Sequence, residues 1–237
     1  MATWDKIRAA AQRPDCIFSA FPDGEAGAMY HPRASADETF KLTNLKCENG
    51  EFVSHTAASS ASNPGGDIIV GKSHNATFIV KFYLDLFEDA TNVYYSALLA
   101  GGSTGGYHTG MGVQSQSVTD GKIAFVANFR YDIEVDGTVT VYRAYGTSFS
   151  INIKQWHTAA IAVDFEKKTH TVYFDGTKYG TYALPAGNVS FSAYNMADTP
   201  PLAFELRNAA KGSIKGKYAL IFNRALSDEE ILCLMEE

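Results

Sequence analysis

The sequence predicts an all-β protein, folded as an antiparallel two-sheet sandwich with one short helix near each end of the chain. Three observations predict this class. Many short segments alternate apolar and polar residues with the period of two that is typical of β-strands, Asp-Gly pairs mark the clearest turns, and no helices alternate with the strands. The 237 residues carry no internal repeat and no Pro/Gly-rich linker, so we expect one domain with a large core.

Composition and charge restrict the class of partner. Hydrophobic residues make up 46% of the chain, as in folded globular proteins, and the formal net charge of −6 argues against nucleic-acid binding. No stretch approaches the roughly 20 apolar residues of a membrane-spanning helix, so no membrane partner is expected. The opening residues lack the apolar core of a secretory signal, and we expect synthesis in the cytoplasm without a signal peptide.

The first residues predict a short amphipathic helix. Thr3 can cap it, Trp4 and Ile7 lie on one apolar stripe, and Pro14 ends it. We assign residues 1–15 to an N-terminal helical extension. Trp4 and Ile7 are expected to pack on a partner protein or on the sandwich, because an exposed Trp would leave apolar surface in water.

Residues 16–237 are assigned to the sandwich domain. Early strands are predicted at 16–21, 76–86 and 93–99, where apolar and β-branched residues gather between turn-forming stretches. A Gly-rich run at 101–106 interrupts this pattern and predicts a loop.

The clearest hairpin covers residues 122–145. Apolar and polar positions alternate along its first strand, and an Asp-Gly pair at 136–137 turns the chain. A two-residue loop would pair Ile133 with Thr140 and mix the two faces. A longer turn, with its glycine in the left-handed region, would pair Ile133 with Val139 and keep the apolar residues together, so we favour the longer turn.

A second hairpin covers residues 159–180, with another Asp-Gly pair at 175–176. Its apolar positions also alternate, which predicts one face turned towards the core. The predicted core comprises Phe125, Phe129, Ile161, Val163, Phe174 and Leu220.

The last strand, at 218–222, runs into a predicted helix. Ser227 followed by Glu230 forms a capping box, in which the hydroxyl and the carboxylate each accept a backbone N–H at the helix start. Leu226 and Ile231 have the spacing of a hydrophobic staple.

Three motifs follow one another in the second half of the chain. Trp156-His157 precedes a strand, a Tyr-x-Asp-Gly hairpin follows at 173–176, and the chain closes with Asn-Arg-Ala-Leu-Ser-x-x-Glu-Ile at 223–231. In this order they resemble the C-terminal half of the laminin G-like, concanavalin A-like jelly-roll domains. The resemblance implies a two-sheet jelly roll that closes with a strand and a short capped helix. This family includes glycan-binding modules, protein-binding modules and, in distant branches, β-glucan hydrolases, so the fold alone does not give the function.

No cofactor is predicted. Cys16, Cys47 and Cys233 are widely spaced without a CxxC pair, which predicts free thiols and neither a disulfide framework nor a zinc site. Some relatives in the resembled family hold Ca²⁺ with loop carboxylates and carbonyls. No Asp-rich loop of that kind stands out here, and Ca²⁺ remains the alternative.

An enzyme is the third hypothesis. Asp132, Glu134 and Asp136 alternate along a strand, as do the carboxylates of the related glucanases, where a pair about 5 Å apart serves a retaining glycoside hydrolase. The order of Asp and Glu differs from the glucanase pattern, and Asp136 falls in a turn. The pattern is therefore interpreted as a polar strand face, and no catalytic residue is predicted.

The leading hypothesis is a non-catalytic recognition module that binds a glycan or surface polysaccharide and is displayed on a particle or cell surface. Sugars bind against aromatic rings with polar side chains beside them. In the longer-turn register, Arg130 lies across from Tyr142 on the face away from the core, and Asp132 lies one pair nearer the turn. These three residues are the predicted ligand site, and the loops around Tyr107 and His108 are the second choice.

The rival hypothesis is a structural or decoration protein of a phage virion. A compact chain of this fold, without disulfides or a leader, suits a particle that leaves its host by lysis. Residues 1–15 would then dock on capsid or tail proteins, with the sandwich displayed outwards. The sequence leaves open whether the chain forms a homo-oligomer.

Overall fold

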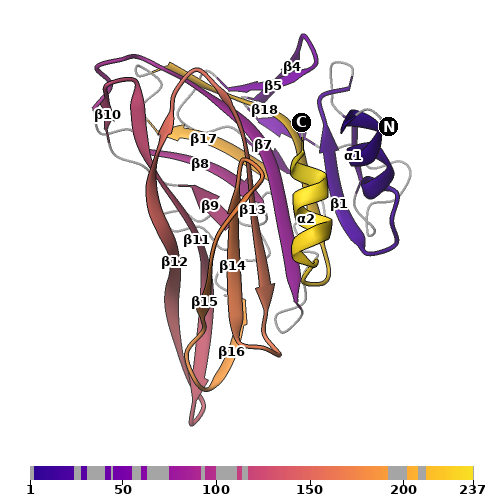
Figure 1. The fold of residues 1–237 in the computed structure, drawn as a ribbon, viewed down its shortest axis with the longest axis vertical. Helices are drawn as coiled ribbons and strands as arrows, with labels where there is room; N and C mark the ends of the chain where they lie inside the picture. Colours follow the sequence, from indigo (N-terminus) through magenta and orange to yellow (C-terminus); the bar gives the residue numbers. More distant parts are fainter. Residues whose placement is uncertain are drawn as a thin grey trace.

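Two antiparallel β-sheets pack face to face, and a helix from each end of the chain lies against the outer face of one of them (Figure 1). The computed structural model describes residues 3–23, 28–30, 41–43, 45–54, 60–62, 75–91, 94–99, 111–113, 117–191, 202–207 and 212–236. The predicted antiparallel two-sheet sandwich with a helix at each end is confirmed. In the part of the chain just given, no helix is long and apolar enough to cross a membrane.

Sheet A carries the two helices, α1 (Thr3–Ala11) and α2 (Asp228–Met235), on its outer face. Its main path runs in the order β15-β14-β13-β7-β18-β1-β2, with β5 beside β18 and β4 beside β5. Its strands are β1 (Cys16–Phe21), β2 (Ala28–Tyr30), β4 (Leu45–Glu48), β5 (Glu51–Ser54), β7 (Ala76–Leu86), β13 (Trp156–Asp164), β14 (Thr169–Phe174), β15 (Thr177–Ala183) and β18 (Gly212–Phe222).

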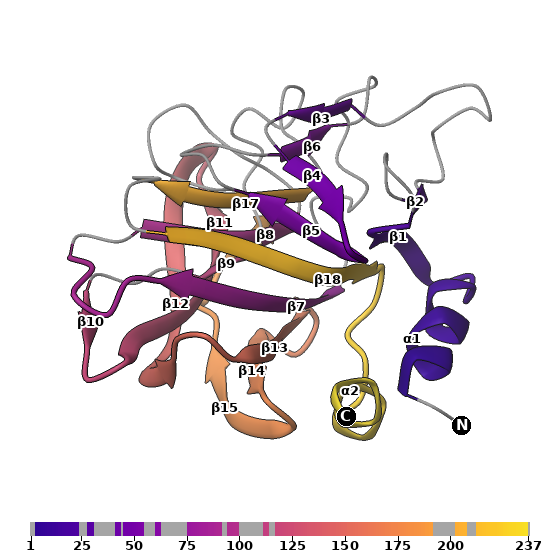
Figure 2. The same ribbon diagram turned by 90° about the horizontal axis from the view of Figure 1, so that it is seen from above.

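Sheet B forms the other layer of the sandwich (Figure 2). Its main path runs in the order β10-β11-β9-β8-β17-β6-β3, and β12 and β16 pair with β11. Its strands are β3 (Lys41–Thr43), β6 (Ser60–Ser62), β8 (Tyr94–Leu99), β9 (Met111–Val113), β10 (Val118–Thr119), β11 (Lys122–Val135), β12 (Thr138–Asn152), β16 (Asn188–Phe191) and β17 (Leu202–Arg207).

Aromatic side chains fill the space between the sheets. Phe82 of sheet A stacks on Phe125 of sheet B with ring centroids 6.0 Å apart, and Phe125 also meets Phe174 at 4.7 Å. The predicted burial of Phe125, Phe174, Ile161 and Val163 is confirmed.

Leu220 and Phe129 are the other two residues of the predicted core. Leu220 is buried, but on the outer face of sheet A beneath the helices instead of between the sheets. Phe129 lies on β11, where its side chain is outside the described part of the structure. The three cysteines are free, as predicted: Cys16 is buried, Cys47 half-buried and Cys233 exposed.

A second apolar layer lies between sheet A and the helices. Ile79 of β7 and Leu220 of β18 pack in one buried cluster with Ile7 of α1 and with Ile231 and Leu234 of α2. Sheet A is therefore buried on both faces where the helices cover it. The first half of β7 is accordingly buried at five consecutive positions, which is typical of a strand covered on both sides.

The turn between β11 and β12 differs from the predicted one. The register pairs Ile133 with Thr140 and Glu134 with Val139, which is the two-residue loop, and the longer turn is wrong. Asp136 and Gly137 have φ of 49° and 76°, the left-handed values of a turn whose twist matches that of antiparallel strands.

The tip of this hairpin explains the difference. Val135 is 57% exposed and Thr138 and Thr140 are also exposed, so the tip extends beyond the core. Placing apolar and polar side chains on the same face therefore costs little free energy there. A β-bulge between Val126 and Asn128 changes the register further along the ladder. The hairpin of β11 and β12 forms the lower end of the molecule in Figure 1.

The predicted capping box of α2 is confirmed. Ser227 Oγ accepts a hydrogen bond from the backbone N–H of Glu230 at 3.2 Å, and Glu230 Oε2 accepts one from the backbone N–H of Ser227 at 2.9 Å. Leu226 and Ile231, the two residues of the predicted staple, are both buried.

Four charged side chains join the two ends of the chain. Arg224, just before α2, donates to Asp15 Oδ2 at 2.6 Å and to Glu230 Oε2 at 2.8 Å. Arg13, just after α1, donates to Asp15 Oδ2 at 2.6 Å and to Glu230 Oε1 at 3.0 Å. We refer to Arg13, Asp15, Arg224 and Glu230 as the terminal ion cluster.

The terminal ion cluster changes the titration of its carboxyl groups. The hydrogen bond from Arg224 holds the pKa of Glu230 well below its usual range, and the Ser227 N–H and Arg13 act in the same direction. Burial alone would raise the pKa of Asp15, but its hydrogen bonds to Arg13 and Arg224 outweigh burial and lower it.

We predict that Glu230→Gln destabilises the fold at neutral pH. The free energy of unfolding at pH 7 should fall by about 1–2 kcal/mol, because the charged hydrogen bonds of a partly exposed carboxylate are lost while Gln keeps the capping geometry. A depressed carboxyl pKa contributes stability that is present above the unfolded-state pKa of about 4.3 and is lost as the pH falls below it. The difference in the free energy of unfolding between the intact chain and Glu230→Gln should therefore become smaller as the pH falls from about 5 to 2.

Urea unfolding across this pH range measures the effect. Glu229→Gln is the matched control, because Glu229 is an exposed carboxylate in the same first turn of α2 and should change the free energy of unfolding by less than about 0.5 kcal/mol. If the difference in the free energy of unfolding does not change with pH, or if both variants lose the same amount of it, the terminal ion cluster does not stabilise the fold.

Candidate functional site

The candidate site lies where the helices stop covering sheet A. Beyond the apolar layer, the outer face of β13, β7 and β18 carries polar and aromatic side chains in two rows, set by direct pairing across the three strands. The row nearer the helices is Thr158, Lys81 and Tyr218, and the next row is Trp156, Tyr83 and Lys215.

A β-bulge in β18 adds one more side chain to this face. Gly216 pairs with Phe82 and Tyr218 pairs with Lys81, so Lys217 is an extra residue between two ladder positions. Bulges re-aim side chains in this way. Lys217 and its neighbour Tyr218 accordingly border the same pocket.

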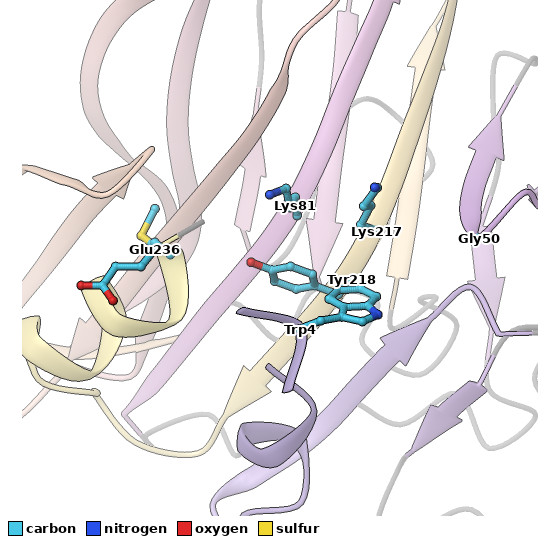
Figure 3. A pocket seen from close by; sticks show the side chains of 7 residues that line it. Trp4, Gly50, Lys81, Lys217, Tyr218 and Glu236 are labelled. Atoms are coloured by element: carbon cyan, nitrogen blue, oxygen red, sulfur yellow. The ribbon is translucent and has the colours of Figure 1, made fainter. Parts of the chain in front are cut away.

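This pocket encloses about 400 Å³ between α1, the end of α2 and sheet A. Figure 3 shows the ring of Trp4 beside that of Tyr218, with Lys81 and Lys217 extending from adjacent strands above them and Glu236 across from them at the end of α2. It is lined by Trp4, Gly50, Lys81, Lys217, Tyr218, Met235 and Glu236, and we refer to it as the Trp4 pocket.

Trp4 is held in place but remains partly open to solvent. Its ring lies 5.9 Å from that of Phe21 in an edge-on arrangement and 5.9 Å from that of Tyr218. The Arg8 guanidinium lies 5.4 Å from its centroid and is itself fixed by two hydrogen bonds of 2.6 Å to Asp23. Because 40% of Trp4 is still exposed, the ring provides a positioned aromatic wall.

The ammonium group of Lys217 is positioned by a second tryptophan. Its Nζ lies 4.8 Å from the centroid of the Trp156 ring, within the range of a cation–π contact. Trp156 in turn contacts Tyr83, with ring centroids 5.4 Å apart. The Lys217 charge is therefore placed at the pocket by the bulge and by the ring beneath it.

A smaller depression of about 300 Å³ lies on the other side of the end of α2. Met235 and Glu236 border both depressions, and Lys217 on the first contacts Trp156 on the second. The second depression is lined by Gln155, Trp156, Thr158, Asp175, Gly176, Met235 and Glu236.

The Trp-His and Asp-Gly motifs meet beside this second depression. His157 is buried, with Nδ1 2.6 Å from Asp175 Oδ2 and Nε2 2.8 Å from the Asn152 carbonyl oxygen. Asp175 Oδ1 also accepts the backbone N–H of Thr158 at 2.8 Å. Both ring nitrogens of His157 therefore have a polar partner. The two motifs thus fasten the start of β13 to the turn between β14 and β15.

The backbone pairing of the residues predicted as the ligand site differs from the predicted one. The register pairs Arg130 with Arg143 and Tyr131 with Tyr142, so the pairing of Arg130 with Tyr142 on which the prediction depended is wrong. For Arg130, Asp132 and Tyr142 the structure describes the backbone but not the side-chain surroundings, and Tyr107 and His108 lie outside the described residues. Ligand binding by these five residues stays a prediction.

The residues of the Trp4 pocket were missed by sequence reasoning, although signals for two of them exist. The sequence predicted that Trp4 packs against another surface, but only the structure shows that its ring stays partly exposed. A glycine inside a strand often marks a bulge, so Gly216 before Lys217-Tyr218 was the available signal for a re-aimed lysine.

The carboxylates considered for catalysis lie elsewhere. Glu134 and Asp136 are exposed at the tip of the β11–β12 hairpin, with Asp136 in the turn itself. Among the residues whose placement is described, no three His, Cys, Asp or Glu side chains come together to hold a metal ion.

We predict that Asp175→Ala destabilises the fold by about 1–3 kcal/mol, because it removes the acceptors of a buried imidazole and a buried N–H. Asp136→Ala is the matched control, since Asp175 and Asp136 occupy the same turn position with φ of 43° and 49°. Denaturant unfolding should show the larger loss for Asp175→Ala. Equal losses would mean that only the strain of the turn is measured.

The chain matches no family model and no curated protein in sequence. It is similar in fold to solved structures of botulinum neurotoxin binding domains. The serotype G binding domain has a TM-score of 0.56 at 14% identity, with 93% of this chain and 50% of that chain covered. The serotype D binding domain has a TM-score of 0.57 at 11% identity, with 93% and 51% covered.

A third similar structure is the serotype D ligand binding domain in complex with N-acetylneuraminic acid, with a TM-score of 0.57, 11% identity and coverage of 93% and 50%. The chain therefore spans about half the length of these domains. At such low identity the similarity shows a common β-sandwich fold.

Proposed function

We propose that this chain is a non-catalytic recognition module that binds a carbohydrate in the Trp4 pocket. The observation that carries the proposal is the pairing of an exposed, positioned aromatic wall with hydrogen-bonding side chains around one cavity. Sugars have apolar faces that pack on aromatic rings, and hydroxyl groups that bind to polar side chains at the rim. Lys81, Lys217 and Glu236 offer both donors and acceptors at the rim of the pocket.

The similar solved structures support a binding role. All of those described above are binding domains, and one was solved with N-acetylneuraminic acid bound. Because the similarity covers about half of that domain, it does not locate the sugar on the part that this chain resembles. The choice of the Trp4 pocket rests on the geometry of this chain.

The rival role, docking of residues 1–15 on capsid or tail proteins, is less favoured. Ile7, Ala10 and Ala11, the apolar stripe that such docking would use, are buried against the sandwich. In α1, the large apolar side chain that is exposed is Trp4, which borders the pocket. Display on a particle or cell surface is compatible with the proposed binding role.

A glycan array with the intact chain and Trp4→Ala tests the proposal. We predict binding to at least one glycan and a loss of affinity of roughly tenfold or more on Trp4→Ala, because the stacking surface is removed. Phe87→Ala is the matched control, since Phe87 is a 56% exposed aromatic residue that is not part of the pocket lining. Circular dichroism should show the same β content in all three proteins.

Two outcomes would contradict the proposal. Glycan binding that survives Trp4→Ala would place the site elsewhere, with Arg130, Asp132 and Tyr142 the next residues to substitute. No binding to any glycan by the intact chain would exclude the carbohydrate-binding role and leave the structural role.

A further inference from the structure

We infer that the Trp4 pocket is one of two adjoining subsites, and that the ligand is an oligosaccharide which extends past the end of α2 and places a neutral sugar unit against Trp156. The inference rests on the proposed function and adds the length of the ligand and the character of its second unit. The second subsite is the smaller depression, which is bordered by Trp156 and Asp175, and we refer to it as the Trp156 subsite.

The two depressions adjoin one another at the end of α2. Met235 and Glu236 border both of them. Thr158 in the Trp156 subsite is the ladder partner of Lys81 in the Trp4 pocket, and paired residues of antiparallel strands lie about 5 Å apart. The lining of one depression therefore continues directly into the lining of the other.

Trp156 gives the second subsite an aromatic wall. Its ring is half-buried and is held by two neighbours, the Tyr83 ring at 5.4 Å between centroids and Lys217 Nζ at 4.8 Å from the Trp156 centroid. A ring that is already held in place loses little side-chain entropy when a ligand packs on it. The Trp156 subsite therefore repeats the combination found at Trp4, a positioned aromatic ring beside polar groups.

Asp175 gives the same subsite a pair of oriented acceptors. Its Oδ2 lies 2.6 Å from His157 Nδ1, and its Oδ1 accepts the backbone N–H of Thr158 at 2.8 Å. Each carboxylate oxygen has two acceptor positions, so each can accept one further hydrogen bond. The side chain is still 39% exposed, so a ligand can reach it. Two adjacent hydroxyl groups of one sugar ring can donate to the two oxygens.

Gln155 supplies a donor at the rim of the subsite. Its side chain is exposed, and its Oε1 accepts a hydrogen bond from Asn152 Nδ2 at 3.0 Å, which orients the amide group. The Nε2 of Gln155 can then donate to a sugar hydroxyl. The carboxylates of Asp175 and Glu236 border this depression and would repel an acid group, so we expect the sugar unit bound here to be neutral.

Two separate aromatic walls favour a chain of sugars over a single sugar. The rings of Trp4 and Trp156 line different depressions, of about 400 and 300 Å³, so one sugar ring packs on one of them. A chain that is held at Trp4 presents its next units to Trp156 within the same complex. This second contact raises the affinity, because it forms at a high effective concentration.

A glycan array that carries size-graded fragments of glucan, mannan, galactan and chitin, from one to six sugar units, tests the inference, and calorimetry measures the hits. We expect glycans whose binding depends on Trp4 to bind at least about tenfold more tightly as fragments of four to six units than as single units. Trp156→Ala should weaken the binding of these longer fragments about tenfold and that of single units less than about threefold.

A second variant and a control separate binding from folding. Gln155→Ala removes an exposed side chain, so the fold should be retained, and the longer fragments alone should bind about three- to fivefold more weakly. Gln12→Ala is the matched control, because Gln12 is an exposed glutamine that borders neither depression, and it should bind every length as the intact chain does. Circular dichroism should show the same β content in all variants.

The failures can be distinguished. If the Trp4-dependent glycans bind as tightly in single units as in longer fragments, or if Trp156→Ala and Gln155→Ala affect all lengths equally, the inference is wrong while the proposed function stands. Oligogalacturonate fragments that gain as much affinity with length as the neutral fragments would contradict the neutral second unit. If no glycan of any length binds, the inference and the proposed function are both wrong.

Discussion

Partial coverage of the outer face of sheet A is the constraint on which the rest of the structure depends. The helix-side half of β7 and β18 is mostly apolar and is buried on both faces, because two short helices from opposite ends of the chain cover its outer face. Neither helix has the length to be stable alone. The apolar layer beneath them, the capping box and the terminal ion cluster hold both in place.

The Trp4 pocket follows from where this cover ends. Past the last apolar row, no helix among the described residues covers sheet A. The outer face there carries Lys81, Tyr83, Trp156 and the bulged Lys217 in place of apolar side chains. Trp4 at the start of α1 and Glu236 after the end of α2 supply the walls. The same contacts that stabilise the fold therefore position the aromatic and charged groups to which we assign ligand binding.

Local patterns in the sequence predicted the helices and strands, but not the contacts between elements that are far apart in the sequence. The strands, the capping box at Ser227 and the burial of Phe125 and Ile161 follow from periodicity and capping rules, which act over a few residues. The β11–β12 register was wrong because face matching applies only where a hairpin covers the core, and this tip extends beyond it. The pocket was missed because Trp4 and Lys217 come from opposite ends of the chain, and no local pattern relates them.

The central claim is that the edge of the helix cover on sheet A is a ligand site, and a crystal structure with the best-binding glycan tests it most directly. We expect the sugar ring to pack against Trp4, with one of its polar groups within about 3 Å of the Nζ of Lys217. A glycan bound at the β11–β12 hairpin or at another surface, with the Trp4 pocket filled only by water, would contradict it.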